Sequence, residues 1–294
     1  MMDAPYLCLD VGGTEIKGAA VSEGRVLTPL RHFPARSGED RETLLAHFAA
    51  VFRQLDEEAG HPPRLGGLRL AFPGPFDYPA GICLLQGLDK YDALYGVSLR
   101  AELFARLRDR LEDPEQIRFT NDVAAFGLGE IHYGDARGSA RSLSVCIGTG
   151  CGSAFGLGDG LAPEGTPAVP PRGEIYPTPF LGKCIDDMIS KRGLMALTEE
   201  RLGTPMGGAE LARRVQEGDR AAAACFAEFG TRLKEALEPF LRGYRPDCLC
   251  LGGQITRSFG LFGDPLRQLC EELGVVVYVA ADTSVLAMQG LCTL

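Results

Sequence analysis

The chain has 294 residues, of which 45% are hydrophobic and 23% charged, and its formal net charge is −9. This length and composition are typical of a globular protein with two domains, and the acidic balance argues against nucleic acid or an anionic membrane surface as a partner. No stretch reaches the roughly 20 apolar residues of a membrane span, the N-terminus lacks the basic segment of a signal peptide, and the ten cysteines show no metal-type spacing, so we expect a protein of the reducing cytoplasm.

Strands and helices are predicted to alternate along the chain. In the first part these are a strand hairpin over 7–21, a strand at 25–27, a helix over 44–55, a strand at 68–72, an irregular segment over 76–96, a helix over 99–111, a strand at 117–119 and a helix that opens at 120–122. The second part has a hairpin over 143–155, a Pro- and Gly-rich loop over 162–182, helices near 183–202, 208–217 and 219–242, strands at 248–251 and 275–279, and a last helix over 284–292.

This alternation predicts an α/β fold, and the hairpins make each sheet mixed rather than purely parallel. We expect an N-terminal domain over 1–120, rejoined by the last helix at 283–294, and a C-terminal domain over 121–282.

The two hairpins repeat one pattern, in which a Gly-rich turn joins two apolar runs. The turns are Gly12–Thr14 in the first half and Gly148–Gly152 in the second. Glycine has no Cβ atom, so backbone N–H groups in such turns can approach an anion closely. One turn in each half indicates two half-molecules that face each other across a nucleotide, and therefore phosphoryl transfer.

Four polar residues have two open interpretations each, and a fifth, Glu174, has one. Asp10 either orients Mg²⁺ through water or bonds its own backbone in a turn. Asp122 is either a general base that accepts a proton from an attacking hydroxyl or an N-cap, and the local pattern alone favours the cap. Asn121 is either a substrate contact or a turn residue, and Lys17 either faces a phosphate or is solvated. Glu174 in isolation is expected to be solvated.

Five segments, in order along the chain, resemble the motifs of the ROK family of sugar kinases, which belongs to the actin-like/hexokinase ATPase superfamily. They are Asp10–Lys17, Ala71–Asp77, Asn121–Glu130, Gly148–Gly152 and Leu251–Ile255. The resemblance implies a two-domain α/β fold with a cleft that closes on ATP–Mg²⁺ and a sugar. It implies phosphorylation of a sugar hydroxyl, most simply the 6-hydroxyl of a hexose or hexosamine, by a homodimer.

The resemblance also implies roles for individual residues. Asp122 becomes the catalytic base and Asp10 the carboxylate that orients Mg²⁺. The implied nucleotide contacts are Asp10, Gly12, Gly13, Thr14, Lys17, Gly148, Thr149, Gly150, Gly152, Gly252 and Gly253. The implied sugar contacts are Gly74, Asn121, Asp122, Glu174 and Asp186.

The chain departs from the family pattern on the sugar side. Many members carry a Gly-His pair and a Cys-rich zinc segment after the counterpart of Glu174, but residues 173–180 contain no histidine and Cys184 is the only cysteine nearby, so we expect no structural zinc. Asp186 aligns roughly with a family glutamate, and residues 84–96 lack the usual Pro-Asn-Leu. The sugar therefore stays open, and so does an inactive sugar-binding relative. A ROK-type transcriptional regulator is disfavoured, because no helix-turn-helix fits before residue 10.

Overall fold

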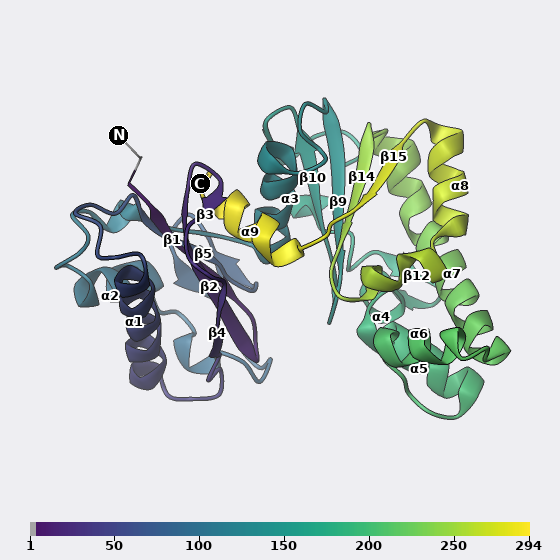
Figure 1. The fold of residues 1–294 in the computed structure, drawn as a ribbon, viewed down its shortest axis with the longest axis horizontal. Helices are drawn as coiled ribbons and strands as arrows, with labels where there is room; N and C mark the ends of the chain where they lie inside the picture. Colours follow the sequence, from purple (N-terminus) through teal and green to yellow (C-terminus); the bar gives the residue numbers. More distant parts are fainter. Residues whose placement is uncertain (1–3) are drawn as a thin grey trace. The chain divides into compact units, whose positions relative to one another are not determined.

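The computed structural model describes residues 4–294. The chain forms two compact units (Figure 1), one made of the residues up to Gly129 together with Ser284–Leu294 and the other of Glu130–Thr283. The passage from one unit to the other lies within helix α3 (Asp122–Tyr133), and the return lies at the start of helix α9 (Thr283–Leu291). The functional domains expected at 1–120 and 121–282 stay a prediction.

The first unit is built on a mixed sheet with the strand order β3-β2-β1-β5-β8, and β4 pairs with β2. β1 is antiparallel to β2 and parallel to β5, which is in turn parallel to β8. The strands are β1 (Tyr6–Val11), β2 (Glu15–Ser22), β3 (Arg25–Val26), β4 (Arg31–Pro34), β5 (Gly67–Ala71) and β8 (Ile117–Thr120). The parallel direction of β1, β5 and β8 brings their carboxyl ends to one edge of the sheet.

Two helices cover this sheet, and the second is shorter than the sequence predicts. α1 (Arg41–Glu58) buries a stripe that includes Phe48 and Phe52. α2 (Leu99–Arg106) ends before the last leucines of the predicted helix, because Leu107 adopts a non-helical φ of −125°. Side chains spaced four residues apart are rotated by about 40° around the helix axis at each step. A long row of such side chains therefore turns away from the core. Leu107 and Leu111 stay buried in the turn that follows.

The segment predicted to be irregular contains short ordered pieces. They are β6 (Phe76–Asp77), β7 (Ile82–Cys83) and the 3₁₀ turn η1 (Asp92–Leu94), and η2 (Pro114–Gln116) precedes β8. β6 and β7 pair as a small antiparallel hairpin. The segment is therefore a folded part of the first unit.

The second unit repeats the plan of the first, with a mixed sheet in the order β11-β10-β9-β14-β15. β9 is antiparallel to β10 and parallel to β14, as β1 is to β2 and β5. The strands are β9 (Arg141–Ile147), β10 (Cys151–Leu157), β11 (Gly160–Leu161), β14 (Cys248–Gly252) and β15 (Val276–Val279). The repeated hairpin of the sequence is thus a repeat of structure.

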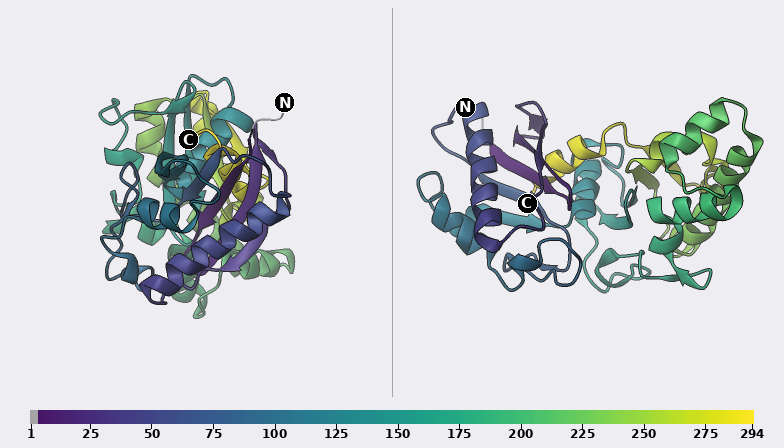
Figure 2. Two further views of the ribbon diagram at one scale, coloured as in Figure 1. Left: turned by 90° about the vertical axis from the view of Figure 1, so that its left-hand side faces the viewer. Right: turned by 90° about the horizontal axis from the view of Figure 1, so that it is seen from below.

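Helices and short elements complete the second unit (Figures 1 and 2). The predicted helix over 183–202 is divided, since Ser190 starts a new helix by accepting a hydrogen bond from the Gly193 N–H. The elements are η3 (Pro171–Gly173), β12 (Pro179–Phe180), β13 (Lys183–Cys184), α4 (Ile185–Met188), α5 (Lys191–Leu202), α6 (Gly208–Gln216), α7 (Arg220–Tyr244), η4 (Ile255–Leu261) and α8 (Asp264–Leu273).

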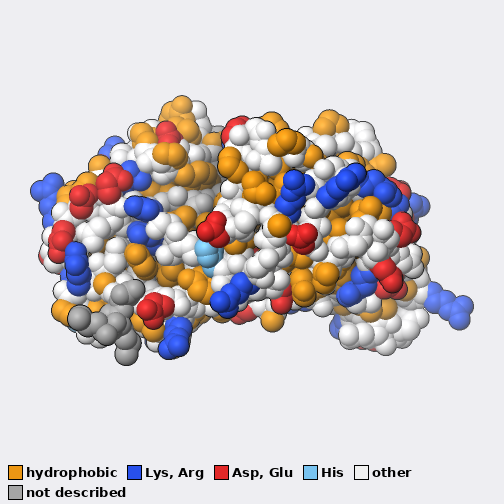
Figure 3. Space-filling view, turned by 90° about the horizontal axis from the view of Figure 1, so that it is seen from above, with side chains coloured by type: hydrophobic (Ala, Val, Ile, Leu, Met, Phe, Trp, Pro, Cys, Tyr) orange, Lys and Arg blue, Asp and Glu red, His pale blue; other side chains and the backbone are white. Residues whose placement is uncertain are grey.

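The surface charges, the cysteines and the helix lengths can be compared with the expectations from composition. Acidic and basic side chains are interspersed on the face drawn in Figure 3. The ten cysteines are free thiols, and most are buried. None of the helices within residues 4–294 has the length and apolar character needed to cross a membrane.

Candidate active site

The two predicted catalytic carboxylates gather at one edge of the first unit's sheet. Asp10 on β1 is in register with Ala71 on β5, and Ala71 is in register with Thr120 on β8. Neighbouring strands lie about 4.8 Å apart, so Asp10 and the start of α3 are separated by roughly 10 Å along this row. The parallel sheet therefore places Asp10 and Asp122 on the same side of the same unit.

Asn121, and not Asp122, caps helix α3. The Asn121 Oδ1 accepts hydrogen bonds from the N–H groups of Val123 at 2.9 Å and Ala124 at 3.4 Å. Asp122 is the first helical residue, its side chain is exposed, and one of its carboxylate oxygens accepts from the Val123 N–H at 2.9 Å. The capping role that the local sequence suggests for Asp122 thus falls to its neighbour, which leaves the Asp122 carboxylate at the helix N-terminus, where negative charge is stabilised.

The surrounding protein raises the pKa of both carboxyl groups. Although Asp122 reaches solvent, the protein atoms around its carboxylate displace much of its hydration, and this desolvation raises its pKa, against the hydrogen bond from Val123 and the positive charge of Lys90. For Asp10 the pKa rises to about 6, mainly by desolvation and then by the charge of Asp122, with Lys17 opposing. Lys17 lies opposite Asp10 in the β1–β2 register and donates from Nζ to the Ser284 Oγ of α9 at 2.7 Å.

The first Gly-rich turn directs its carbonyl groups at protein partners. The Gly12 carbonyl accepts from the Tyr91 hydroxyl at 2.8 Å, and the Gly13 carbonyl accepts from the Ser37 Oγ at 2.6 Å. In a trans peptide the N–H points opposite to the preceding carbonyl, so the N–H groups of Gly13 and Thr14 point away from these partners. The Gly12 N–H is used inside the turn, on the Glu15 carbonyl at 2.9 Å. The turn can therefore offer two N–H groups to an anion.

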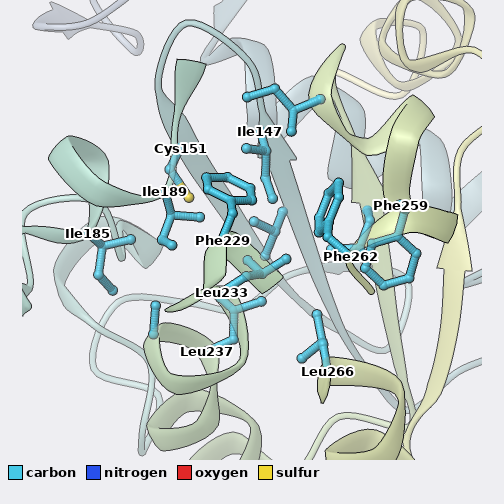
Figure 4. Packing of buried hydrophobic residues seen from close by; sticks show 14 of the residues in the cluster. Ile147, Cys151, Ile185, Ile189, Phe229, Leu233, Leu237, Phe259, Phe262 and Leu266 are labelled. Atoms are coloured by element: carbon cyan, nitrogen blue, oxygen red, sulfur yellow. The ribbon is translucent and has the colours of Figure 1, made fainter. Parts of the chain in front are cut away.

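The second Gly-rich turn is anchored at both ends in the core of its unit. Figure 4 shows Ile147 and Cys151, which flank the turn, pointing into the same apolar cluster as Phe229 of α7. The Gly148 carbonyl accepts from the Lys191 N–H at 2.8 Å, and the Gly148 N–H donates to the Gly150 carbonyl at 2.9 Å. Thr149 at the tip is exposed.

Asp186 accepts a hydrogen bond from this turn. Its Oδ1 accepts from the Cys151 N–H at 2.6 Å, and its other oxygen pairs with Arg192. A Cβ atom on Gly150 would lie 2.8 Å from the same Oδ1, so a larger residue here would require the Asp186 carboxylate to move. The structure therefore places Asp186 against Gly150, a residue expected to contact the nucleotide, and against the neighbouring Cys151.

Gly252 and Gly253 lie beside the second turn. Gly252 ends β14 in register with Cys146 of β9. Gly253 has a φ of +95°, and a Cβ atom there would lie 2.3 Å from the Ile147 carbonyl. Its N–H donates to the Thr283 Oγ1 at 2.9 Å. The second unit thus brings its predicted nucleotide residues together.

Glu174 lies in a loop that is tied to β10 just past Gly152. The Ser153 Oγ donates to the Gly173 carbonyl at 2.6 Å and accepts from the Ile175 N–H at 3.0 Å. The Glu174 carboxylate itself pairs with Arg172 at 2.6 Å. The flanking bonds place Glu174 near the second turn, although its side chain is held by a neighbour.

Gly74 and Asn121 share a neighbour that the sequence interpretation missed. A Cβ atom on Gly74 would lie 3.5 Å from the Tyr78 Oη, which receives a hydrogen bond from the Asn121 Nδ2 at 3.4 Å and donates to the Phe72 carbonyl at 3.0 Å. Lys90 and Tyr91 are also missed residues of the site. Their only sequence signal is the length of the segment over 76–96, since long loops in compact domains are usually functional.

No cluster of three or more His, Cys, Asp or Glu side chains suited to a metal ion occurs within residues 4–294. Asp10 is a single hard oxygen donor at the sheet edge. Such a donor fits Mg²⁺, which keeps most of its water shell and binds proteins through one or two carboxylates together with substrate phosphates.

Replacing Asp10 by Asn is expected to stabilise the protein at neutral and alkaline pH. A carboxyl whose pKa is raised from 3.8 to about 6 on folding binds its proton more tightly in the folded state, so its contribution to stability falls as the pH rises from 4 to 6. At about 1.4 kcal/mol per pKa unit, the penalty at pH 8 is about 2–3 kcal/mol. Urea denaturation midpoints at pH 4, 6 and 8 should show the variant's advantage at pH 8 and its loss at pH 4. Equal midpoints at pH 8 would contradict this expectation.

Comparisons with known proteins support the interpretation of these motifs. The family model described as "ROK family" matches residues 6–287. The chain is 25% identical over 279 residues to the N-acetyl-D-glucosamine kinase of Aliivibrio salmonicida, with 89% of this chain and 87% of that protein covered. It is 25% identical over 286 residues to the glucokinase of Thermotoga maritima, with 88% and 85% covered.

The fold has solved counterparts. The crystal structure of a ROK family glucokinase from Streptomyces griseus, in complex with glucose and AMPPNP, matches with a TM-score of 0.74 at 17% identity, over 99% of this chain and 98% of that one. The predicted fold class, α/β with mixed sheets in two parts, is confirmed. Because the family model covers nearly the whole chain, the protein belongs to the ROK family.

Proposed function

We propose that this protein is an ATP-dependent sugar kinase in which Asp122 is the general base. The observation that carries the proposal is the position of Asp122, exposed at the N-terminus of α3 and freed from capping by Asn121. It shares a unit with Asp10 and with a turn whose N–H groups face away from their carbonyl partners. The similarity of the chain to an N-acetyl-D-glucosamine kinase and a glucokinase supports a sugar as the acceptor.

In the proposed reaction, Asp122 accepts the proton of a sugar hydroxyl as the oxygen attacks the γ-phosphorus of ATP. The bond from phosphorus to the β-phosphate oxygen breaks, and ADP leaves. A raised pKa makes the ionised Asp122 carboxylate a stronger base than that of an ordinary aspartate. The N–H groups of Gly13 and Thr14 bind phosphate oxygens, which fixes the direction of attack.

The remaining contacts are proposed from the family motifs. The nucleotide is held by Gly12, Lys17, Gly148, Thr149, Gly150, Gly152, Gly252 and Gly253. The sugar is contacted by Gly74, Asn121, Glu174 and Asp186, and the last two must exchange their pairing with Arg172 and Arg192 to do so.

Asp10 is the residue proposed to hold Mg²⁺, through water. When bound with ATP, the ion neutralises charge on the β- and γ-phosphates. With a pKa of about 6, Asp10 is ionised at neutral pH and can play this role. We further propose that the enzyme is a cytoplasmic homodimer that acts on the 6-hydroxyl of a hexose or hexosamine, without nucleic acid as a partner.

The proposal is tested by ADP release over glucose, mannose, N-acetylglucosamine and N-acetylmannosamine, with a no-sugar control. We expect at least one sugar to raise ADP release, and ³¹P NMR of its product to identify the phosphorylated position. A sugar that binds in calorimetry while no sugar raises ADP release would favour an inactive sugar-binding relative instead.

A further inference from the structure

Lys90 is a cation placed between the first Gly-rich turn and Asp122. Its side-chain carbons Cδ and Cβ lie 3.4 and 4.0 Å from the position of a Cβ atom on Gly13. Its charge also acts on Asp122, where it favours the ionised carboxylate. The ammonium group is therefore near both the turn that would hold phosphate and the base that would receive the acceptor's proton.

The backbone at Lys90 is fixed relative to this turn by its neighbour Tyr91. Tyr91 adopts a left-handed φ of 57°, its N–H donates to the Ser37 carbonyl at 2.7 Å, and its hydroxyl donates to the Gly12 carbonyl. The Ser37 Oγ in turn donates to the Gly13 carbonyl. The fully buried Tyr91 ring packs against Phe72 at a centroid distance of 5.2 Å. These ties leave Lys90 little freedom to move away from the turn.

The two lysines of this edge differ in what they bind. Lys17 donates to the Ser284 Oγ, so its ammonium is fixed against α9. Lys90 is half-buried, and its ammonium makes no hydrogen bond or ion pair within the described part of the chain. A half-buried lysine whose ammonium makes no hydrogen bond loses hydration on folding, and an anionic ligand would compensate that loss.

We propose that Lys90 contacts the transferred phosphoryl group and stabilises its negative charge between the β-phosphate and the sugar oxygen. This inference rests on the proposed function, because it requires the γ-phosphate of ATP beside Asp122. Lys90 keeps its protons throughout, and the proton of the sugar hydroxyl goes to Asp122. The phosphorus–oxygen bond to ADP breaks as the bond to the sugar oxygen forms, and both changes occur within reach of the ammonium group.

The test compares AMPPNP, which has a γ-phosphate, with ADP, which has none. For Lys90→Met, calorimetry on the full chain is expected to show a dissociation constant for AMPPNP raised by about 10-fold, the scale of one charge-assisted hydrogen bond, and a constant for ADP within about twofold of wild type. Turnover should fall by about 10²-fold, and Lys90→Arg should recover part of both effects. Lys234→Met removes a lysine paired with Glu238 on α7 and should change neither.

Equal changes in AMPPNP and ADP affinity for Lys90→Met, or no change in either, would overturn the inference. Lys90→Gln replaces the Met variant in the same comparison if the latter does not fold. If the wild type turns over no sugar, the proposed function fails, yet the AMPPNP–ADP comparison still decides whether Lys90 meets the γ-phosphate.

Discussion

Replacing Asp122 by Asn is expected to lower kcat by about 10²–10⁴-fold, the usual scale for removing a general base. The amide can still accept the hydrogen bond that the Val123 N–H donates, and Asn121 still caps α3, so the helix should form as before. The loss should fall on kcat and leave the affinity for AMPPNP within a few-fold of wild type. Steady-state kinetics and calorimetry on the purified variant measure both quantities.

Asp89→Asn is the matched control for this variant. This variant makes the same chemical change at an exposed residue of the segment 84–96. The backbone φ of Asp89 is 54°, which asparagine adopts readily. We expect its kcat to stay within about twofold of wild type, since it lies outside the proposed machinery. A kcat for Asp122→Asn above about a tenth of the wild-type value would place the base elsewhere.

The pH dependence of the wild type gives a check on the two carboxylates of the site, Asp122 and Asp10. The base must be ionised to accept a proton, and Asp10 must be ionised to hold Mg²⁺, so kcat/KM falls as the pH decreases through the pKa values of Asp122 and Asp10 in the free enzyme. Because desolvation raises both pKa values, activity should be lost at a higher pH than for ordinary aspartates. A profile that stays flat down to the usual aspartate range would contradict the electrostatics described for the site.

The sequence predicted best those elements whose signals are local. Both hairpins can be predicted from the sequence because their apolar runs and glycine turns are signals that span only a few residues. The strands β5 and β14 can be predicted because they are short apolar runs. Helix α8 carried a comparable signal that was overlooked, with Pro265 at its start and Gly274 after its end.

Other parts of the site depend on contacts between distant segments, which no local pattern reports. The capping choice between Asn121 and Asp122 depends on the backbone geometry at the end of β8. The position of Lys90 depends on the Tyr91 hydroxyl reaching a carbonyl of the first turn, far away in the chain. The family motifs predict a role for Asp122 but give none to Lys90, because residues 84–96 depart from the family pattern.

Replacing Gly290 by Ala is expected to destabilise the first unit strongly and to impair catalysis with it. A Cβ atom on Gly290 of α9 would lie 1.9 Å from the Ala125 carbonyl oxygen and 2.5 Å from the Gly129 nitrogen of α3. A Cβ atom on Gly129 would in turn lie 2.0 Å from the Leu286 carbonyl oxygen, so the two helices cross with their backbones in contact. Because the clashing atoms belong to backbones, relief requires the helices to separate.

We expect a loss of about 3 kcal/mol or more, at the upper end for overpacking, and a thermal transition lowered by roughly 10 °C. Separation would also shift α3, which starts at Asp122, and α9, whose Ser284 holds Lys17, so kcat should fall as well. Gly38→Ala is the control, since its Cβ atom meets nothing within 4 Å and its stability should change by less than about 0.5 kcal/mol. Differential scanning calorimetry compares the two variants, and a transition for Gly290→Ala that coincides with the control's would mean that α9 does not pack on α3 as closely as described.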